Sequence, residues 1–135
     1  MTDLVLAGCA IFKDKSIILL HRKKTGWYEL PGGKLEPKED PKTGAIRELK
    51  EELGCDVEII KKLGSKEFEE YGQNLLYHWF QARLKPGHDF QICEKEKFDH
   101  FKWIRLDALK DYKLSPNMEN FLHELENFEI QWNKG

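Results

Sequence analysis

Three glutamates near the middle of the chain, Glu48, Glu51 and Glu52, lie at helical spacing. Residues three and four apart are neighbours on an α-helix, so these carboxylates gather on one arc of its surface. Like charges at this spacing destabilise a helix by about 0.2–0.5 kcal/mol per pair, a cost that a bound cation would offset. Clustered carboxylates suit Mg²⁺ or Mn²⁺ when the ion also holds phosphates. The alternative is an ordinary solvated acidic surface.

Local signals place these glutamates on a helix with defined ends. Asp40 can cap its N-terminus, Pro41 suits the first helical position, and Gly54 suits the residue after its C-terminus. At about 100° per residue, the arc beside the glutamates is apolar and is expected to face the core. The residues of this apolar arc are Ala45, Ile46, Leu49 and Leu53. The three glutamates are therefore expected on the exposed arc.

The helix belongs to a longer motif, GKLEPKEDPKTGAIRELKEELGC, at residues 33–55. Every specified position fits the pattern G-x5-E-x7-R-E-U-x-E-E-x-G-U, where U is apolar and Cys55 counts as a small hydrophobic residue. This motif is similar to the Nudix box, and the chain resembles the Nudix hydrolase family. The resemblance implies a single domain over residues 1–135 with an α/β/α sandwich fold, a mixed β-sheet and about two main helices.

The same resemblance implies hydrolysis of a nucleoside diphosphate linked to another moiety, with Mg²⁺ as cofactor and Mn²⁺ able to replace it. The implied metal ligands are Gly33, through its carbonyl, and Glu48, Glu51 and Glu52. Arg47 is expected to orient carboxylates through a bidentate pair, and Glu39 to anchor the loop onto the helix. Catalytic roles then fall to Arg47 and to Glu51, which is one candidate for the general base.

A second candidate for the base lies outside the box. Members of the family often draw a carboxylate from a loop before a late strand, and Glu94 and Glu96 precede a predicted strand at 100–106. We expect Glu96 to be the base because it is closer to that strand, with Glu94 as second choice. The alternative for both is an exposed run of charges.

Three further residues are candidates for substrate binding. Arg22 resembles a basic residue that relatives place near the phosphates, and a plain surface arginine is the alternative. Asn117 can read a base with its donor and acceptor, or cap the last helix. Tyr71 lies 16 residues past Cys55, where diadenosine polyphosphate hydrolases tend to carry a tyrosine, and it also suits a strand end.

Aromatic residues and histidines give weaker signals. Four aromatic residues can stack on a base but are more typical of a core: Phe12, Trp27, Tyr28 and Tyr77. Four histidines show no ligand spacing and receive no role: His78, His88, His100 and His123.

The approach to the box, WYELPGG at residues 27–33, is similar to MutT-like nucleoside triphosphate pyrophosphohydrolases, which release a monophosphate and pyrophosphate. This is the activity we expect. Glu69 and Glu70 stand where ADP-ribose-directed members tend to carry a proline, which counts against that subclass. The alternatives are a diadenosine polyphosphate hydrolase, favoured by Tyr71, and a non-catalytic nucleotide-binding sensor, against which the intact box glutamates argue.

Composition limits the partners. The 22 Lys and Arg against 24 Asp and Glu give a net charge of −2, which argues against binding a nucleic-acid polymer. The longest apolar runs, such as 17–20, are far short of the roughly 20 residues of a membrane span. Residues 1–3 lack the features of a signal peptide, and three scattered cysteines do not suggest a disulfide framework. We expect a cytoplasmic monomer or homodimer that acts on a small nucleotide.

Alternation of apolar and polar residues predicts the remaining elements. A helix is expected over 118–128, and Asp14-Lys15 is expected to form a hairpin turn. Pro31-Gly32-Gly33 is expected to end a short strand. Strands are expected at 4–12, 16–21, 27–30, 57–60, 66–71, 75–84 and 100–106.

Overall fold

The computed structural model describes residues 2–130. The two ends of the predicted domain 1–135, residue 1 and residues 131–135, lie outside the described residues. Its larger sheet is mixed and has the strand order β5-β1-β7-β6. Strand β1 (Leu4–Ala10) is parallel to β7 (Gln73–Leu84) and antiparallel to β5 (Gly32–Lys34), and β6 (Val57–Glu70) is antiparallel to β7. The pairing of β1 with β5 brings the start of the box motif to the edge of this sheet.

A second, smaller sheet is antiparallel throughout. Its strands are β2 (Phe12–Lys13), β3 (Ser16–Arg22), β4 (Tyr28–Glu29) and β8 (Phe98–Arg105), with β8 paired to β3. Strand β3 is buried along most of its length because apolar clusters cover both of its faces.

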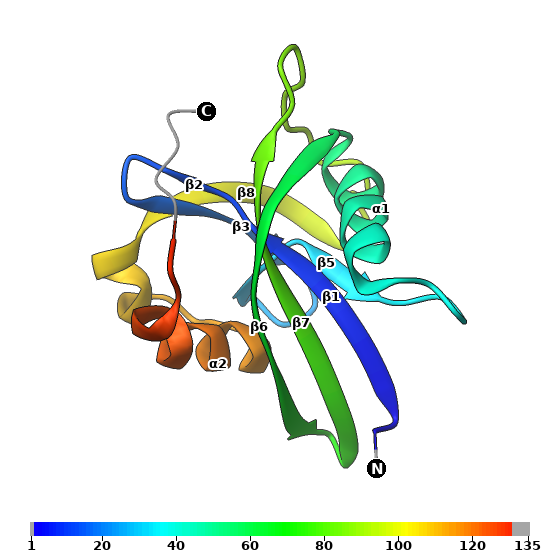
Figure 1. Cartoon of the computed structure of the whole chain (residues 1–135). Coiled ribbons are helices and arrows are strands. Elements are labelled where there is room, and N and C mark those ends of the chain that lie inside the picture. Colours follow the sequence, from blue (N-terminus) through cyan, green and yellow to red (C-terminus); the bar gives the residue numbers. More distant parts are fainter. Residues whose placement is uncertain (1, 131–135) are drawn as a thin grey trace.

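Helices cover both sides of the strands, as Figure 1 shows. Helix α1 (Pro41–Leu53) packs on one apolar cluster, built around Ile18 and Leu49. The other side carries the 3₁₀ helix η1 (Leu106–Asp111), α2 (Pro116–Glu124) and η2 (Leu125–Asn127). The predicted α/β/α sandwich, with a mixed sheet and two main helices, is confirmed.

Local signals set the two ends of α1. The Asp40 side chain accepts hydrogen bonds from the backbone N–H groups of Lys42 and Thr43, and Pro41 is the first helical residue. Gly54 adopts a left-handed φ of 64° and donates its N–H to the Lys50 carbonyl, as a C-terminal glycine does. Both predicted helix ends are confirmed.

The hairpin at Asp14-Lys15 is also confirmed. Both residues have positive φ, 48° and 62°, and they join β2 to β3 with Phe12 opposite Ile17. Positive φ at both central residues gives the turn the twist that an antiparallel pair requires.

Some predictions about elements are wrong in detail. The two strands predicted at 57–60 and 66–71 are one continuous strand, β6. Bulges near Lys61 and Gly64 let the residues between them stay paired with β7. Tyr71 lies in the following turn, with a φ of 50°. The short strand does end before Pro31, because β4 stops at Glu29, but the chain forms a further strand, β5, from Gly32. Helix α2 begins at Pro116 and is capped by Ser115, whose hydroxyl accepts the Met118 N–H, so Asn117 is not the cap.

Candidate active site

The three box glutamates differ strongly in burial. Glu52 is 4% exposed, whereas the side chains of Glu48 and Glu51 are 15% and 48% exposed. On a helical wheel Glu52 lies about 40° from Glu48 toward the core-facing arc, while Glu51 lies about 60° away on the other side. The predicted exposure of Glu52 is therefore wrong, because its position adjoins the apolar arc at Ala45.

The buried Glu52 carboxylate is held by backbone. Its Oε1 accepts a hydrogen bond of 2.7 Å from the N–H of Gly32, the first residue of β5. Burial raises the pKa of Glu52 well above its usual range, and the hydrogen bond from Gly32 opposes that rise. Burial also raises the pKa of Glu48, against the opposing positive charge of Arg47.

Gly33 and Glu48 are in close contact. A Cβ added at Gly33 would lie 2.7 Å from Oε2 of Glu48, closer than side chains approach one another. A glycine at this position therefore allows the Glu48 carboxylate to lie directly against the β5 backbone.

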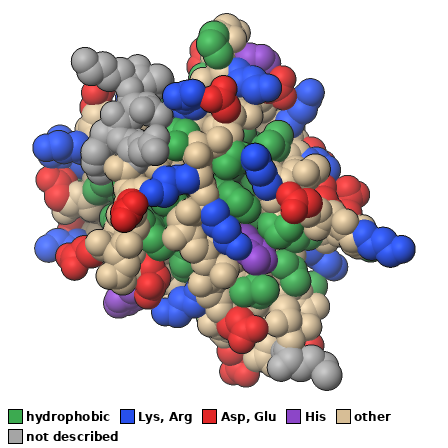
Figure 2. Space-filling model, in the orientation of Figure 1, with side chains coloured by type: hydrophobic (Ala, Val, Ile, Leu, Met, Phe, Trp, Pro, Cys, Tyr) green, Lys and Arg blue, Asp and Glu red, His purple; other side chains and the backbone are tan. Residues whose placement is uncertain are grey.

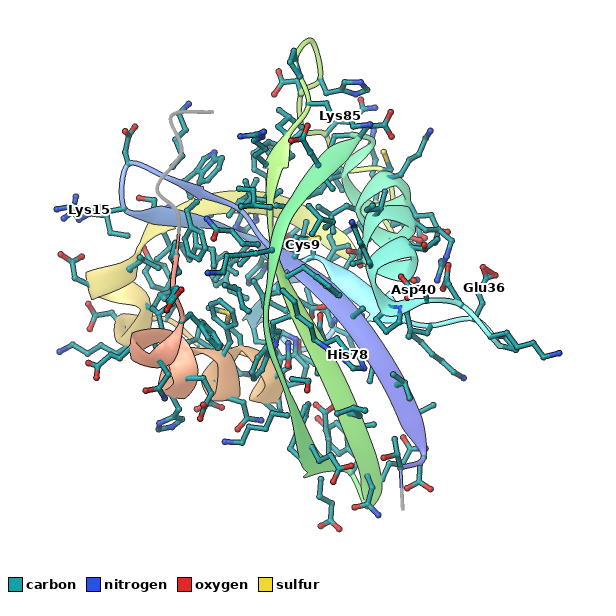
Figure 3. All side chains as sticks on the ribbon, viewed as in Figure 1. Cys9, Lys15, Glu36, Asp40, His78 and Lys85 are labelled. Carbon is teal, nitrogen blue, oxygen red and sulfur yellow. The ribbon has the colours of Figure 1, made fainter. Side chains whose placement is uncertain are left out.

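Arg47 ties the box together. Its guanidinium donates two hydrogen bonds of 2.8 Å to the Glu39 carboxylate, and further bonds to Glu48 and Glu51 at 3.2 and 2.9 Å. The hydrogen bonds from Arg47 lower the pKa of Glu39 to about 2. The bidentate pair and the anchored loop agree with the arrangement expected from the sequence. Figure 3 shows the loop, with Asp40 at the start of α1 and Glu36 farther out.

Glu94 and Glu96 lie in different surroundings. Glu94 is partly buried, and its charge adds to the raised pKa of both Glu48 and Glu52, for which burial is the main cause. Its backbone carbonyl accepts the N–H groups of Lys97 and Phe98, which fixes the turn before β8. Glu96 is exposed. Glu94 is thus the member of this loop whose charge influences the box glutamates, whereas Glu96 is exposed to solvent.

A cleft of about 450 Å³ opens beside the box. Gly32 and Gly33 form part of its wall. All three predicted substrate-binding residues line it as well: Arg22, Tyr71 and Asn117. Sequence-distant residues that were proposed separately therefore share one cavity.

Arg22 is fixed inside this cleft by Glu29. Its Nε and Nη2 donate to the two oxygens of the Glu29 carboxylate at 2.6 and 2.9 Å, and Trp27 Nε1 donates to the same carboxylate at 2.7 Å. The guanidinium also lies 4.9 Å from the centre of the Phe98 ring. Glu29 was not identified from the sequence, where a single acidic residue in a short strand carries no signal of its partners.

Asn117 and Tyr71 lie at different parts of the cleft. The Oδ1 atom of Asn117 accepts a hydrogen bond of 3.1 Å from the indole N–H of Trp79, which fixes the orientation of the amide. Tyr71 is 84% exposed at the turn between β6 and β7.

The four aromatic candidates divide between the cleft and the core. Trp27 and Tyr77 line the cleft, and Tyr77 is also buried in the same core cluster as Phe12. Tyr28 packs against His21 and His100 instead.

Comparison with known proteins identifies the class of this fold and site. A family model described as the NUDIX domain matches residues 3–125. The chain therefore belongs to the Nudix hydrolase family. The crystal structure of a MutT NUDIX hydrolase from Burkholderia pseudomallei superposes with a TM-score of 0.82 and 26% sequence identity, over 90% of this chain and 97% of that one.

Two curated relatives are similar over most of their length. An 8-oxo-dGTP diphosphatase of Buchnera aphidicola subsp. Schizaphis graminum is 30% identical, over 90% of this chain and 92% of the relative. A CTP pyrophosphohydrolase of Escherichia coli K12 is 30% identical, over 86% of each. Across the curated relatives, this chain spans between 38% and 92% of their length. Within residues 2–130, each helix is too short or too polar to cross a membrane.

Proposed function

We propose that this protein is a Mg²⁺-dependent nucleoside triphosphate pyrophosphohydrolase that releases a nucleoside monophosphate and pyrophosphate, with Mn²⁺ able to replace Mg²⁺. The observation that carries the proposal is the shared cleft, which joins the Gly32–Gly33 edge of the box to Arg22 and Asn117. Its volume of about 450 Å³ falls within the range of small-molecule sites. One nucleotide can then contact the box with its phosphates and Asn117 with its base.

The donor set of the box suits a hard divalent cation. Arg47 donates a hydrogen bond to one oxygen of Glu48 and one of Glu51, and Gly32 donates to one oxygen of Glu52. Each carboxylate has a second oxygen that can bind a cation. With the Gly33 carbonyl, these oxygens match the ligands that Mg²⁺ prefers. Bound there, the cation would neutralise bridging phosphate oxygens and lower the pKa of a water molecule.

The protein's own groups have separate tasks in this reaction. A water oxygen bonds to phosphorus as the bridging P–O bond breaks, pyrophosphate leaves, and the water proton passes to a carboxylate base. We assign the base to Glu94, because it is the partly buried member of its loop, with Glu51 and Glu96 as alternatives. Arg47 holds the carboxylates of Glu48 and Glu51 in position.

Substrate binding uses two further residues that line the cleft, Arg22 and Asn117. Glu29 fixes the Arg22 guanidinium through two of its five N–H donors, so other donors can reach a phosphate. Because the Asn117 oxygen accepts from Trp79, its amide N–H groups are the atoms that would meet an acceptor on the base. The named activities of the two curated relatives, on CTP and on 8-oxo-dGTP, support a nucleoside triphosphate as substrate.

The surface favours a small nucleotide over a nucleic-acid polymer. Figure 2 shows Lys and Arg side chains interspersed with Asp and Glu over the face it draws. Binding to a long phosphate backbone relies on many contacts with positively charged side chains. The net charge of −2 does not favour such binding.

A nucleotide panel tests the proposal. Normal and oxidised nucleoside triphosphates, diadenosine polyphosphates and nucleotide sugars are incubated with Mg²⁺ or Mn²⁺ at neutral and alkaline pH, and products are resolved by chromatography. We expect a nucleoside monophosphate and pyrophosphate in equal amounts from a triphosphate. Release of inorganic phosphate alone would contradict the reaction type, and binding without turnover would support the sensor alternative.

A diadenosine polyphosphate is the second candidate substrate, favoured by Tyr71. This side chain is 84% exposed at the edge of the cleft, where a second adenine can stack on it. Under this alternative, Tyr71→Ala raises KM for the diadenosine substrate and leaves KM for a triphosphate unchanged.

A further inference from the structure

Strand β8 bulges where it passes His21. His100 pairs with His21 and Phe98 pairs with Arg22, so Asp99 is an extra residue between two regular pairs. Successive residues of a regular strand point to opposite faces. The bulge instead brings Asp99 and His100 together, with 2.8 Å between Asp99 Oδ1 and His100 Nδ1.

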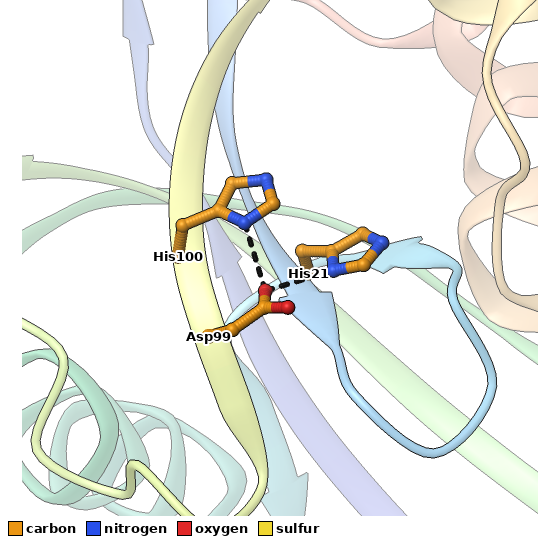
Figure 4. Close-up of side chains that lie close together, drawn as sticks. All are labelled: His21, Asp99 and His100. Atoms are coloured by element: carbon orange, nitrogen blue, oxygen red, sulfur yellow. Dashed lines mark hydrogen bonds and ion pairs between the residues drawn. The ribbon is translucent and has the colours of Figure 1, made fainter.

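His21 completes a cluster on the same face. Its Nδ1 lies 2.8 Å from the same Asp99 oxygen. Figure 4 draws this contact as a dashed line. The two imidazole rings stack with their centres 4.7 Å apart and 17° between their planes. One ligand atom from each of the three residues lies within 4.8 Å of the others.

A neighbouring tyrosine fixes the ring of His100. The Tyr28 hydroxyl lies 2.9 Å from His100 Nε2, the nitrogen that faces away from Asp99. Metal-binding histidines typically donate their second ring N–H to an oxygen in this way, which orients the ring and fixes its tautomer. Tyr28 therefore supplies what a ligating His100 requires.

The cluster is open to an ion from solvent. The side chains of His21, Asp99 and His100 are 22%, 43% and 47% exposed. It is also separate from the cleft, because the adjacent residue Arg22 lines the cleft and successive side chains of β3 point to opposite faces.

We propose that His21, Asp99 and His100 form a binding site for a divalent transition-metal ion of the Zn²⁺ class, distinct from the box carboxylates. Two imidazoles and one carboxylate suit Zn²⁺, Ni²⁺ or Cu²⁺, whereas Mg²⁺ prefers oxygen ligands alone. Three protein ligands leave one position of a tetrahedral ion for water. The ion would join β3 to β8 across the bulge.

Zinc binding in the presence of excess Mg²⁺ tests this site, because Mg²⁺ occupies the carboxylates of the box without competing for imidazole. Zn²⁺ is titrated calorimetrically into the full chain, into His21→Ala and His100→Ala, and into His123→Ala as a matched control. His123 is an exposed histidine on α2. We expect one Zn²⁺ per chain, an affinity at least about 10-fold weaker in the first two variants, and no change in the control.

The orienting role of Tyr28 has its own variant. Tyr28→Phe keeps the ring and removes the hydroxyl that contacts His100, so Zn²⁺ affinity should fall by about 10-fold while the number of ions bound stays at one.

A measurement on the unaltered chain keeps the proposal testable if a variant fails to fold. Zn²⁺ should shift the imidazole NMR signals of His21 and His100 and leave that of His123 in place. Equal Zn²⁺ affinity in His21→Ala, His100→Ala and His123→Ala would overturn the proposal. So would the absence of any zinc binding, or of any shift at His21 and His100, in excess Mg²⁺; the three residues would then form a hydrogen-bonded cluster alone.

Discussion

The carboxylate of Glu52 accepts a hydrogen bond of 2.7 Å from the backbone N–H of Gly32. This bond joins helix α1 to strand β5, where the box motif begins and where Gly32 and Gly33 line the cleft. It also holds a carboxylate in a buried position, where the charged form is disfavoured. The ionised Glu52 carboxylate is therefore destabilised by its burial, and a bound cation would offset this electrostatic cost.

The first prediction concerns that cost. Glu52→Gln keeps an oxygen that can accept the Gly32 N–H and removes the buried charge, so the cation-free protein should become more stable. A gain of about 1 kcal/mol corresponds to a rise in Tm of roughly 2–8 °C, measured with EDTA present.

The pH dependence of that gain has a definite sign. Because the folded pKa of Glu52 is raised, the wild-type loses stability as pH rises from the unfolded value of 4.5 through the folded pKa. The advantage of Glu52→Gln should therefore be larger at about pH 8 than at about pH 4.5. If Glu52→Gln is less stable than wild-type at the higher pH in EDTA, the inference that the buried Glu52 charge destabilises the cation-free fold is contradicted.

The ion pair between Arg47 and Glu39 gives a second prediction. The pKa of Glu39 is about 2 in the folded protein, against an ordinary value of 4.5. The ion pair therefore stabilises the folded protein above pH 4.5, and this stabilisation is lost as the pH falls toward 2. In denaturant titrations across this range, wild-type should exceed Glu39→Gln most at the upper end, and the difference should shrink as pH falls. A difference that does not change with pH would argue against the pair.

The contact between Gly33 and Glu48 gives a third prediction. In Gly33→Ala the new methyl group would lie 2.7 Å from the Glu48 carboxylate, which must move. A displacement of about 1 Å at a reacting site can cost about 10²-fold in rate, so we expect kcat to fall by that order.

Gly64→Ala is the matched control for Gly33→Ala, because a Cβ there would meet only Phe128 at an ordinary 3.5 Å. It should retain wild-type kcat. Equal activity of the two variants would show that the position of Glu48 does not matter for turnover.

Features set by local chemistry could be predicted from the sequence. The ends of α1 follow from Asp40, Pro41 and Gly54, which act within one turn of their own positions. The turn at Asp14-Lys15 is equally local. The box spacing predicts which glutamates gather on one side of α1, although their burial depends on β5, which contacts the helix from elsewhere in the chain.

Features set by strand register could not be predicted. The pairing of Arg22 with Glu29, whose carboxylate also accepts from Trp27, depends on the antiparallel register of β3 and β4. His100 shows no ligand spacing in the sequence, and it lies opposite His21 because of the antiparallel register of β3 and β8. The bulge in β8 then brings Asp99 beside both histidines. A bulge depends on the partner strand, so the spacing of residues along one strand does not reveal it.

The general base gives a fourth prediction. Removing a general base typically lowers the rate by 10²–10⁴-fold, so Glu94→Gln should lower kcat at saturating Mg²⁺ by at least about 10²-fold. Glu96→Gln, from the exposed position in the same loop, should keep more than about a third of wild-type kcat. The reverse result would restore Glu96 as the base, and full activity in both variants would move the role to Glu51.

The central claim is that the box carboxylates bind the divalent cation needed for nucleotide hydrolysis. Its most direct test is kcat for the best triphosphate of the panel, measured with Mg²⁺ for wild-type, Glu51→Gln and Glu69→Gln. Glu51 is the most exposed of the three box glutamates, so its loss should not unfold the chain, and Glu69 is an exposed glutamate on β6. We predict a fall of at least about 10²-fold in Glu51→Gln, wild-type turnover in Glu69→Gln, and loss of all activity with EDTA. Wild-type turnover by Glu51→Gln, or hydrolysis that persists in EDTA, would contradict the claim.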